Sequence, residues 1–126
     1  NPGSDVTIVA TGHLVWEALQ AAEELESQGI NAEVINIHTI KPLDEEIILN
    51  SIKKTGCLVS AEEHNYLGGL GESISGLLGL KHPTPMEIVA TQDTFGESGT
   101  PAQLMTKYGL DKASIINKAH KVIKRK

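Results

Sequence analysis

Short runs of aliphatic residues recur along the chain, and each is followed by a longer stretch with helical periodicity. The short runs are almost continuous in apolar character, which is typical of strands buried on both faces of a parallel sheet. They span residues 6–10, 32–37, 57–61 and 86–90. The longer stretches place apolar side chains three to four residues apart, which predicts helices with one buried face.

The first two predicted helices carry recognisable end signals. One begins at Leu14 and ends at Gly29, and Ile30 is placed to make the hydrophobic contact that follows a left-handed glycine. The apolar face of this helix comprises Leu14, Ala18, Ala21 and Leu25. The next helix follows the capping residue Asp44 and ends at Gly56. Its predicted inner face comprises Ile47, Ile48 and Ile52.

Further helices are predicted after the third strand. The first of them has an inner face formed by Leu70, Ile74, Leu77 and Leu78. A polar loop at residues 91–99 follows the fourth strand, and a capping box at residues 100–103 then starts a short helix that ends at Gly109. Asp111 caps the last helix. The inner stripe of that helix comprises Ile115, Ile116, Ala119, Val122 and Ile123.

The order of these elements predicts a three-layer α/β/α fold. Strict alternation of buried strands and helices favours a mainly parallel sheet covered on both faces. Right-handed crossovers then give the strand order 2-1-3-4. A chain of 126 residues is too short for two separate cores, so residues 1–126 are expected to form one domain. Residues 1–5 are interpreted as a linker or an excised boundary.

The predicted topology also indicates where a ligand or a partner would sit. The winding reverses between strands one and three, and such folds bind ligands beyond the carboxyl ends of those strands. The candidate crevice or interface residues there are Thr11, Gly12, His13, Glu62, Glu63, His64 and Asn65. Asp93 joins them from the long polar loop, because long loops in compact domains are often functional.

Specific motifs at this edge do not support a metal or phosphate site. Glu62 and Glu63 are adjacent on an extended segment, so their carboxylates point to opposite sides and do not easily serve one ion. The turn at residues 68–71 lacks the lysine and the hydroxyl residue that a P-loop needs. No serine or cysteine stands beside a histidine and an acid, and Cys57 opens a buried strand, which predicts an inert core thiol.

Composition narrows the class of protein further. The formal net charge of −5 and the scarcity of aromatic residues argue against nucleic-acid binding. One cysteine fits a reducing compartment, and no apolar run reaches the length of a membrane span, so the cytoplasm is the expected location. The basic residues 121–126 are interpreted as the solvated last turn of a helix.

Several segments, in the same order along the chain, resemble the carboxy-terminal domain of the thiamine-diphosphate-dependent transketolase superfamily. They are residues 5–12, 36–44, 62–64 with 68–72, and 95–99 with 108–110. The superfamily includes transketolase, 1-deoxyxylulose-5-phosphate synthase and the beta chains of 2-oxo acid dehydrogenases. The last pair of segments resembles transketolase itself, particularly the split bacterial and archaeal type.

The resemblance implies a non-catalytic domain that supports packing and dimerisation of a parent enzyme. That parent, a homodimer of the pentose phosphate pathway, would transfer a two-carbon ketol unit between sugar phosphates. Thiamine diphosphate and Mg²⁺ would lie in its other domains, so no catalytic, cofactor-binding or metal-binding residue is assigned here. The only arginine of this chain, Arg125, lies in the basic tail. The resemblance also implies an additional antiparallel strand at the sheet edge.

Other functions stay open at this point. The same domain occurs in 1-deoxyxylulose-5-phosphate synthase and in dehydrogenase beta chains, which would make the chain part of one of those enzymes. A small-ligand regulatory module that uses the crevice is the alternative from a different class of protein.

Overall fold

The computed structural model describes residues 3–11, 14–37, 44–62, 70–90 and 112–126. The strands are β1 (Val6–Ala10), β2 (Ala32–Asn36), β3 (Leu58–Glu62) and β4 (Met86–Ala90). The helices are α1 (Leu14–Ser27), α2 (Glu45–Thr55), α3 (Leu70–Lys81) and α5 (Lys112–Ile123). The predicted polar loop and short helix between residues 91 and 109 lie outside the described residues.

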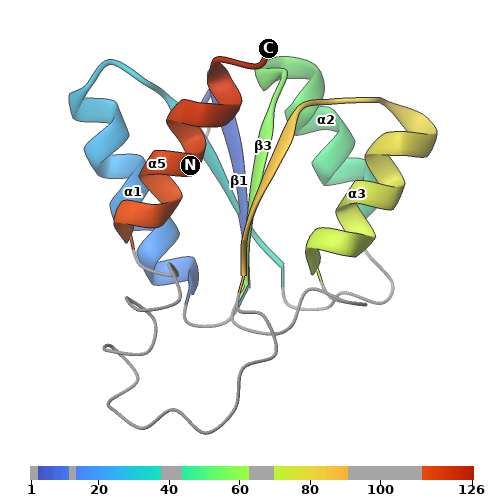
Figure 1. The fold of residues 1–126 in the computed structure, drawn as a ribbon, viewed down its shortest axis with the longest axis horizontal. Helices are drawn as coiled ribbons and strands as arrows, with labels where there is room; N and C mark the ends of the chain where they lie inside the picture. The colour runs from blue at the N-terminus through green and yellow to red at the C-terminus, as the bar shows by residue number, and fades with distance from the viewer. Residues whose placement is uncertain (1–2, 12–13, 38–43, 63–69, 91–111) are drawn as a thin grey trace, which may run out of the picture.

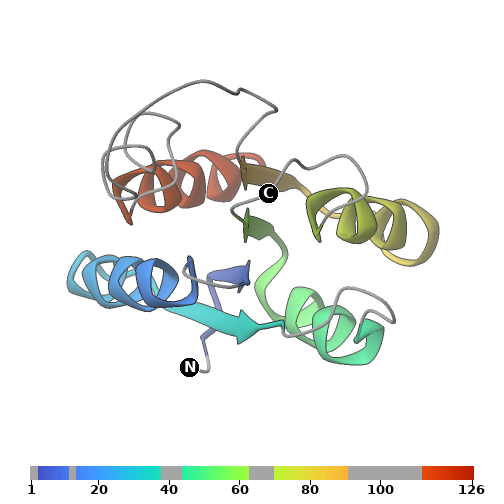
Figure 2. The same cartoon turned by 90° about the horizontal axis from the view of Figure 1, so that it is seen from below.

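The strands form one parallel sheet with the order β2-β1-β3-β4, which confirms the predicted topology. Helices α1 and α5 cover one face of the sheet, and α2 and α3 cover the other (Figure 1, Figure 2). The edge strands of this sheet are β2 and β4. No further strand of the described part of the chain pairs with the outer edge of β2.

The sheet separates two aliphatic cores. Val6, Ile8 and Ala10 of β1 point toward α1 and α5, whereas Val9 points toward α2 and α3. Such alternation is expected of a strand buried on both faces. Burial of these aliphatic side chains stabilises the layered arrangement, which holds the carboxyl ends of all four strands at one edge.

Glycine ends both helices that flank β2, as predicted. Gly29 has a φ of 83°, and Ile30 donates its amide to the carbonyl of Leu25 over 2.9 Å while Gly29 donates to Glu26 over 3.0 Å. This pair of bonds is the Schellman motif. Gly56 ends α2 in the same left-handed region, with a φ of 80° and one bond to the carbonyl of Ile52.

The prediction for the inner face of α2 was wrong at one position. Ile47 is 46% exposed, and the buried residues of the helix are Ile48, Ser51, Ile52 and Thr55. Two hydroxyl residues therefore face β1 where an apolar residue was expected. The physical reason is a polar partner on the strand, because the Thr7 hydroxyl is hydrogen-bonded to the hydroxyls of both Ser51 and Thr55 within the core.

Smaller differences concern strand ends. The third strand begins at Leu58 rather than Cys57 and includes Glu62, and β2 ends at Asn36 rather than Ile37. On α5, Ile115, Ala119 and Val122 are buried, whereas Ile116 and Ile123 are partly buried against the same core. Asp44 caps α2 as predicted, with its carboxylate accepting the amide of Ile47 over 3.3 Å.

Candidate functional site

The crevice was predicted at the carboxyl ends of β1 and β3. The amide of Thr11 donates to the carbonyl of Ala61 over 3.2 Å, which ties the two strand ends together. Glu62 ends β3 and is 1% exposed. The structure thus brings Thr11 and Glu62 to one edge of the sheet. The remaining candidates lie outside the described residues: Gly12, His13, Glu63, His64, Asn65 and Asp93.

Metal binding gains no support from the part of the chain that is described. Within residues 3–11, 14–37, 44–62, 70–90 and 112–126, no group of three or more histidine, cysteine, aspartate or glutamate side chains is arranged to hold an ion. At the predicted position of the crevice, the described residues provide two strand ends and one buried carboxylate.

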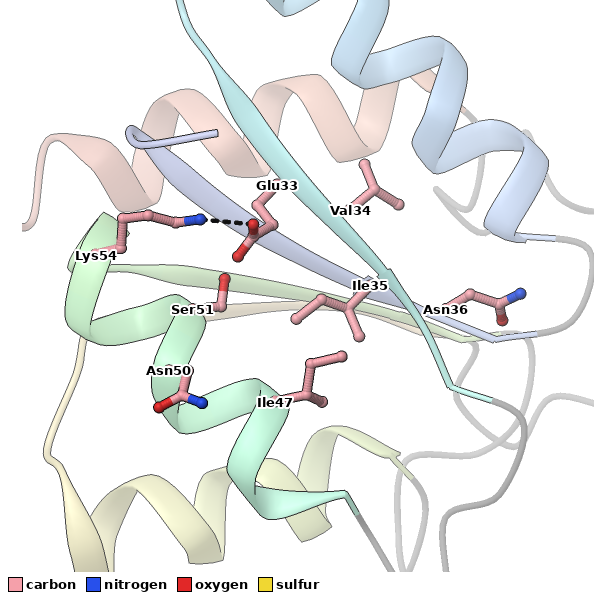
Figure 3. Close-up of a pocket in the computed structure, with 8 residues that line it drawn as sticks. All are labelled: Glu33, Val34, Ile35, Asn36, Ile47, Asn50, Ser51 and Lys54. Atoms are coloured by element: carbon pink, nitrogen blue, oxygen red, sulfur yellow. Dashed lines mark hydrogen bonds and ion pairs between the residues drawn. The ribbon is translucent and has the colours of Figure 1, made fainter. Parts of the chain in front are cut away.

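A groove that sequence reasoning missed lies between the outer edge of β2 and the helix α2. Its volume is about 520 Å³. The lining residues are Glu33, Val34, Ile35, Asn36, Ile47, Asn50, Ser51 and Lys54 (Figure 3). Ile35 and Ile47 give the groove apolar side chains in its middle, and Asn36 and Asn50 add amide groups. The exposed Ile47 is therefore a wall of this groove.

The charged end of the groove is a closed ion pair. Lys54 donates to the carboxylate of Glu33 over 2.7 Å (Figure 3). Burial alone would raise the pKa of Glu33, but the hydrogen bonds from Lys54 and Ser51 and the charge of Lys54 outweigh it, so the pKa lies below its ordinary value. Among the residues that line the groove, these two carry the ionisable groups. The two ionisable groups of the groove are thus paired with each other.

A buried chain of hydroxyl groups supports the groove from beneath. The Thr7 hydroxyl lies 2.6 Å from the hydroxyl of Ser51 and 2.7 Å from that of Thr55. Thr55 also donates to the carbonyl of Cys57 over 3.1 Å. These contacts attach α2 to β1 and fix the side of the helix that faces the groove. Hydrogen-bonded polar groups of this kind orient a helix more specifically than aliphatic contacts alone.

The lone cysteine and the basic tail are both engaged. The thiol of Cys57 donates to the carbonyl of Asp5 over 3.3 Å, and burial raises its pKa. Glu87 on β4 forms ion pairs with Lys118, Lys121 and Arg125 of the last helix and the residues after it. The basic end of the chain is therefore partly folded back onto the sheet edge rather than only solvated.

None of the described helices has the combination of length and apolar content that a membrane crossing requires.

Comparison with known proteins gives a consistent result. Residues 1–115 match the family model described as "Transketolase, C-terminal domain". The chain is 51% identical over 124 residues to the 6-deoxy-6-sulfo-D-fructose transketolase subunit SqwH of Clostridium sp. (strain MSTE9). The matched region covers 98% of this chain and 38% of that protein. This chain is also 41% identical over 115 residues to 1-deoxy-D-xylulose-5-phosphate synthase 1 of Geobacter sulfurreducens. That match covers 90% of this chain and 18% of the synthase.

A solved structure shares the fold closely. It is described as "Split gene transketolase, inactive beta4 tetramer", and it superposes with a TM-score of 0.93 at 41% identity. The match covers 98% of this chain and 40% of that one. The chain therefore spans well under half the length of the relatives that it matches.

Proposed function

The chain belongs to the transketolase C-terminal domain family, and on that basis we propose that it is the non-catalytic carboxy-terminal domain of a larger transketolase. The parent enzyme transfers a two-carbon ketol unit from a ketose phosphate to an aldose phosphate. Its other domains hold thiamine diphosphate and Mg²⁺, and this domain supports their packing. The proposed cofactor and reaction follow from the family, since relatives of this chain are transketolase subunits.

The observation that carries the non-catalytic role is how the cationic groups are used. A sugar-phosphate site needs arginine or lysine groups that are available to a phosphate. The only arginine, Arg125, donates instead to the carboxylate of Glu87 and to the carbonyl of Met86. Lys54 and Lys81 are paired with Glu33 and with an acid of α2. Arg125, Lys54 and Lys81 thus form ion pairs within the domain itself.

The outer edge of β2 is the proposed place for the additional antiparallel strand that the family resemblance implies. The inner edge of β2 is already paired with β1 along its whole length. An unpaired outer edge exposes backbone donors and acceptors, and native proteins usually cover such an edge. The adjoining groove offers Ile35 and Ile47 to the side chains of an added strand. Such a strand would come from the remainder of the parent polypeptide.

Self-association is part of the proposal as well. One relative is named a transketolase subunit, and the description of one solved relative is of a β4 tetramer. We therefore infer that the parent chain assembles with copies of itself and with a partner subunit or domain that completes the active site. The cytoplasm is its proposed location.

The test uses the longer polypeptide that contains these residues, combined with its partner subunit. We expect ketol transfer between a ketose phosphate and an aldose phosphate, and we expect it to be lost when residues 1–126 are deleted from an otherwise soluble preparation. Transfer that survives the deletion would refute the supporting role. Formation of 1-deoxy-D-xylulose 5-phosphate in place of ketol transfer would favour the second candidate, a domain of a 1-deoxy-D-xylulose-5-phosphate synthase. The 41% identity of this chain to such a synthase is the observation that supports this candidate.

A further inference from the structure

The residues that lead into β1 are attached to the domain at several points. Asp5 donates its amide to the carbonyl of Asn31 over 2.9 Å, and the carboxylate of Asp5 accepts the amide of Asn31 over 2.7 Å. The carbonyl of Asp5 accepts the thiol of Cys57 over 3.3 Å. The amide, the side chain and the carbonyl of Asp5 are therefore all hydrogen-bonded to the domain. Residues that lead into a domain are poorly ordered unless contacts of this kind hold them.

The partner of Asp5 lies in a corner whose backbone is itself fixed. Asn31 follows Gly29 and Ile30, whose amides close the Schellman motif at the end of α1. Directly after Asn31 the strand β2 begins, and it is paired with β1 along its length. Asp5 is thus bonded to a residue that is held between a helix end and a strand start.

Gly3 makes a contact that leaves no room for a side chain. A Cβ on residue 3 would lie 2.5 Å from the carbonyl carbon of Ala32, 2.7 Å from its oxygen and 2.8 Å from the amide nitrogen of Glu33. These atoms belong to the backbone of β2, so they cannot turn away as the end of a side chain can. The φ of Gly3 lies outside the left-handed region, so close approach and not backbone conformation requires glycine here.

We propose that residues 3–5 form a rigid entry joint, which sets the direction in which the preceding polypeptide of the parent enzyme leaves this domain. This inference rests on the proposed function, in which the other domains of the parent hold the coenzyme. Gly3 and Asp5 are then positioning residues, because they act by orienting the domains that carry the reaction. A small change of direction at the joint displaces distant groups by more than it displaces the joint itself.

The close approach of Gly3 determines the effect of a substitution. An alanine Cβ only 2.5 Å from the carbonyl carbon of Ala32 would overlap it, so either the entry joint or β2 must move. Because β2 is held by its pairing with β1, the entry joint moves and the bonds of Asp5 are lost. A displacement of about 1 Å at an active site costs up to about 10²-fold in rate.

The first experiment measures hydrogen exchange in the 126-residue chain by nuclear magnetic resonance. The amides of Asp5 and Asn31 should be protected in the wild type, and Gly3→Ala should speed their exchange at least about tenfold, since opening of the entry joint frees both. The amide of Thr7 should keep its exchange rate, because it is hydrogen-bonded inside the domain. Unprotected Asp5 and Asn31 amides in the wild type, or equal rates in Gly3→Ala and the wild type, overturn the proposal.

Two matched variants separate the joint from a general effect of mutation. Ser4→Ala changes the exposed residue between the two positioning residues, and it should leave the exchange rates within about twofold of the wild type. Asp5→Asn should resemble the wild type, because its side-chain oxygen can still accept the amide of Asn31. Asp5→Ala should resemble Gly3→Ala. Equal rates in Asp5→Asn and Asp5→Ala overturn the role given to Asp5.

Proteolysis tests the joint in the longer polypeptide without an activity assay. Endoproteinase Asp-N cleaves before aspartate, and it should cut the bond between Ser4 and Asp5 slowly in the wild type. Gly3→Ala should be cut there at least about tenfold faster, because cleavage follows the population of the open form. Equal cleavage of the wild type and Gly3→Ala contradicts a rigid joint.

The last experiment measures ketol transfer by the longer polypeptide with its partner subunit. Gly3→Ala and Asp5→Ala should lower kcat at least about tenfold, whereas Ser4→Ala and Asp5→Asn should leave it within about twofold. The unchanged exchange rate of Thr7 shows that a variant domain is still folded. Equal kcat values for Gly3→Ala and Ser4→Ala overturn the positioning role. Absence of ketol transfer in the wild type contradicts the proposed function instead, and the exchange and cleavage rates then decide on the joint by themselves.

Discussion

Replacing glycine by alanine at two open positions isolates the energetic cost of a left-handed backbone. A Cβ added at Gly29 or at Gly76 meets no atom within 4 Å, so neither substitution is limited by space. The two sites differ in conformation. Gly29 has a φ of 83°, whereas Gly76 lies inside the helix α3 and outside the positive-φ region. Any difference between the two variants therefore reports backbone conformation alone.

The expected effects have opposite signs. A left-handed alanine costs about 1–2 kcal/mol, and the reduced freedom of its unfolded chain returns about 0.4–1 kcal/mol. Gly29→Ala should therefore lower the free energy of unfolding by about 1 kcal/mol. Gly76→Ala should raise it by about 0.5–1 kcal/mol, because alanine is the better helix former. The two variants should differ by nearly 2 kcal/mol.

Urea unfolding followed by far-ultraviolet circular dichroism measures the difference. With an m-value of about 2 kcal/mol/M, a change of 1 kcal/mol moves the midpoint by about 0.5 M. Gly29→Asn serves as a matched control, since asparagine tolerates the left-handed region better than alanine, and its midpoint should fall between those of Gly29→Ala and wild type. Equal midpoints for Gly29→Ala and Gly76→Ala would refute the reasoning.

Three further predictions concern buried or paired groups. Burial alone would raise the pKa of Glu87, but the neighbouring Arg125, Lys121 and Lys118 hold the pKa below its ordinary value. The stability that this carboxylate contributes is therefore present above its unfolded-state pKa and is lost as pH falls through the lower folded-state pKa. Urea midpoints should therefore fall less between pH 7 and pH 3 in Glu87→Gln than in wild type, and parallel curves would contradict this. Cys57 should resist a thiol reagent in the native chain and react once the chain is unfolded in urea, because it is buried and its pKa is raised; rapid native labelling would contradict its placement. Thr7→Val should lower the free energy of unfolding by about 1–2 kcal/mol, because it takes a partner from the hydroxyls of Ser51 and Thr55, and an unchanged midpoint would show that the buried hydroxyls are not coupled.

Most of the fold follows from local patterns. Continuous apolar runs located all four strands to within one residue, because strands buried on both faces leave little room for polar side chains. The handedness of crossovers then determined the strand order. Gly29, Gly56 and Asp44 marked helix ends correctly, since their effects act within one helical turn.

The inner face of α2 could not be derived from apolar spacing alone. Its buried stripe includes Ser51 and Thr55, and both are buried because Thr7 lies opposite them. That pairing joins residues more than 40 positions apart in the sequence, and no local pattern indicates it. The groove between α2 and the outer edge of β2 was not predicted for the same reason. Its walls come from both elements, and local sequence patterns do not determine how the two lie relative to each other. A threonine within an otherwise aliphatic strand was the available signal.

The candidate site residues were predicted from topology rather than from chemistry. Topology correctly placed Thr11 and Glu62 at one edge of the sheet, since parallel strands share the direction of their ends. The burial of Glu62 was not anticipated, because a glutamate at a strand end is usually exposed. The roles of the neighbouring crevice residues stay predictions.

The most direct measurement is a calorimetric titration of this chain with thiamine diphosphate and Mg²⁺, set beside the same titration of the longer polypeptide with its partner subunit. The domain assignment predicts no binding heat for the chain alone and saturable binding for the complete assembly. Tight, stoichiometric binding of thiamine diphosphate to the 126-residue chain by itself would contradict the central claim that this domain supports the enzyme without holding its coenzyme.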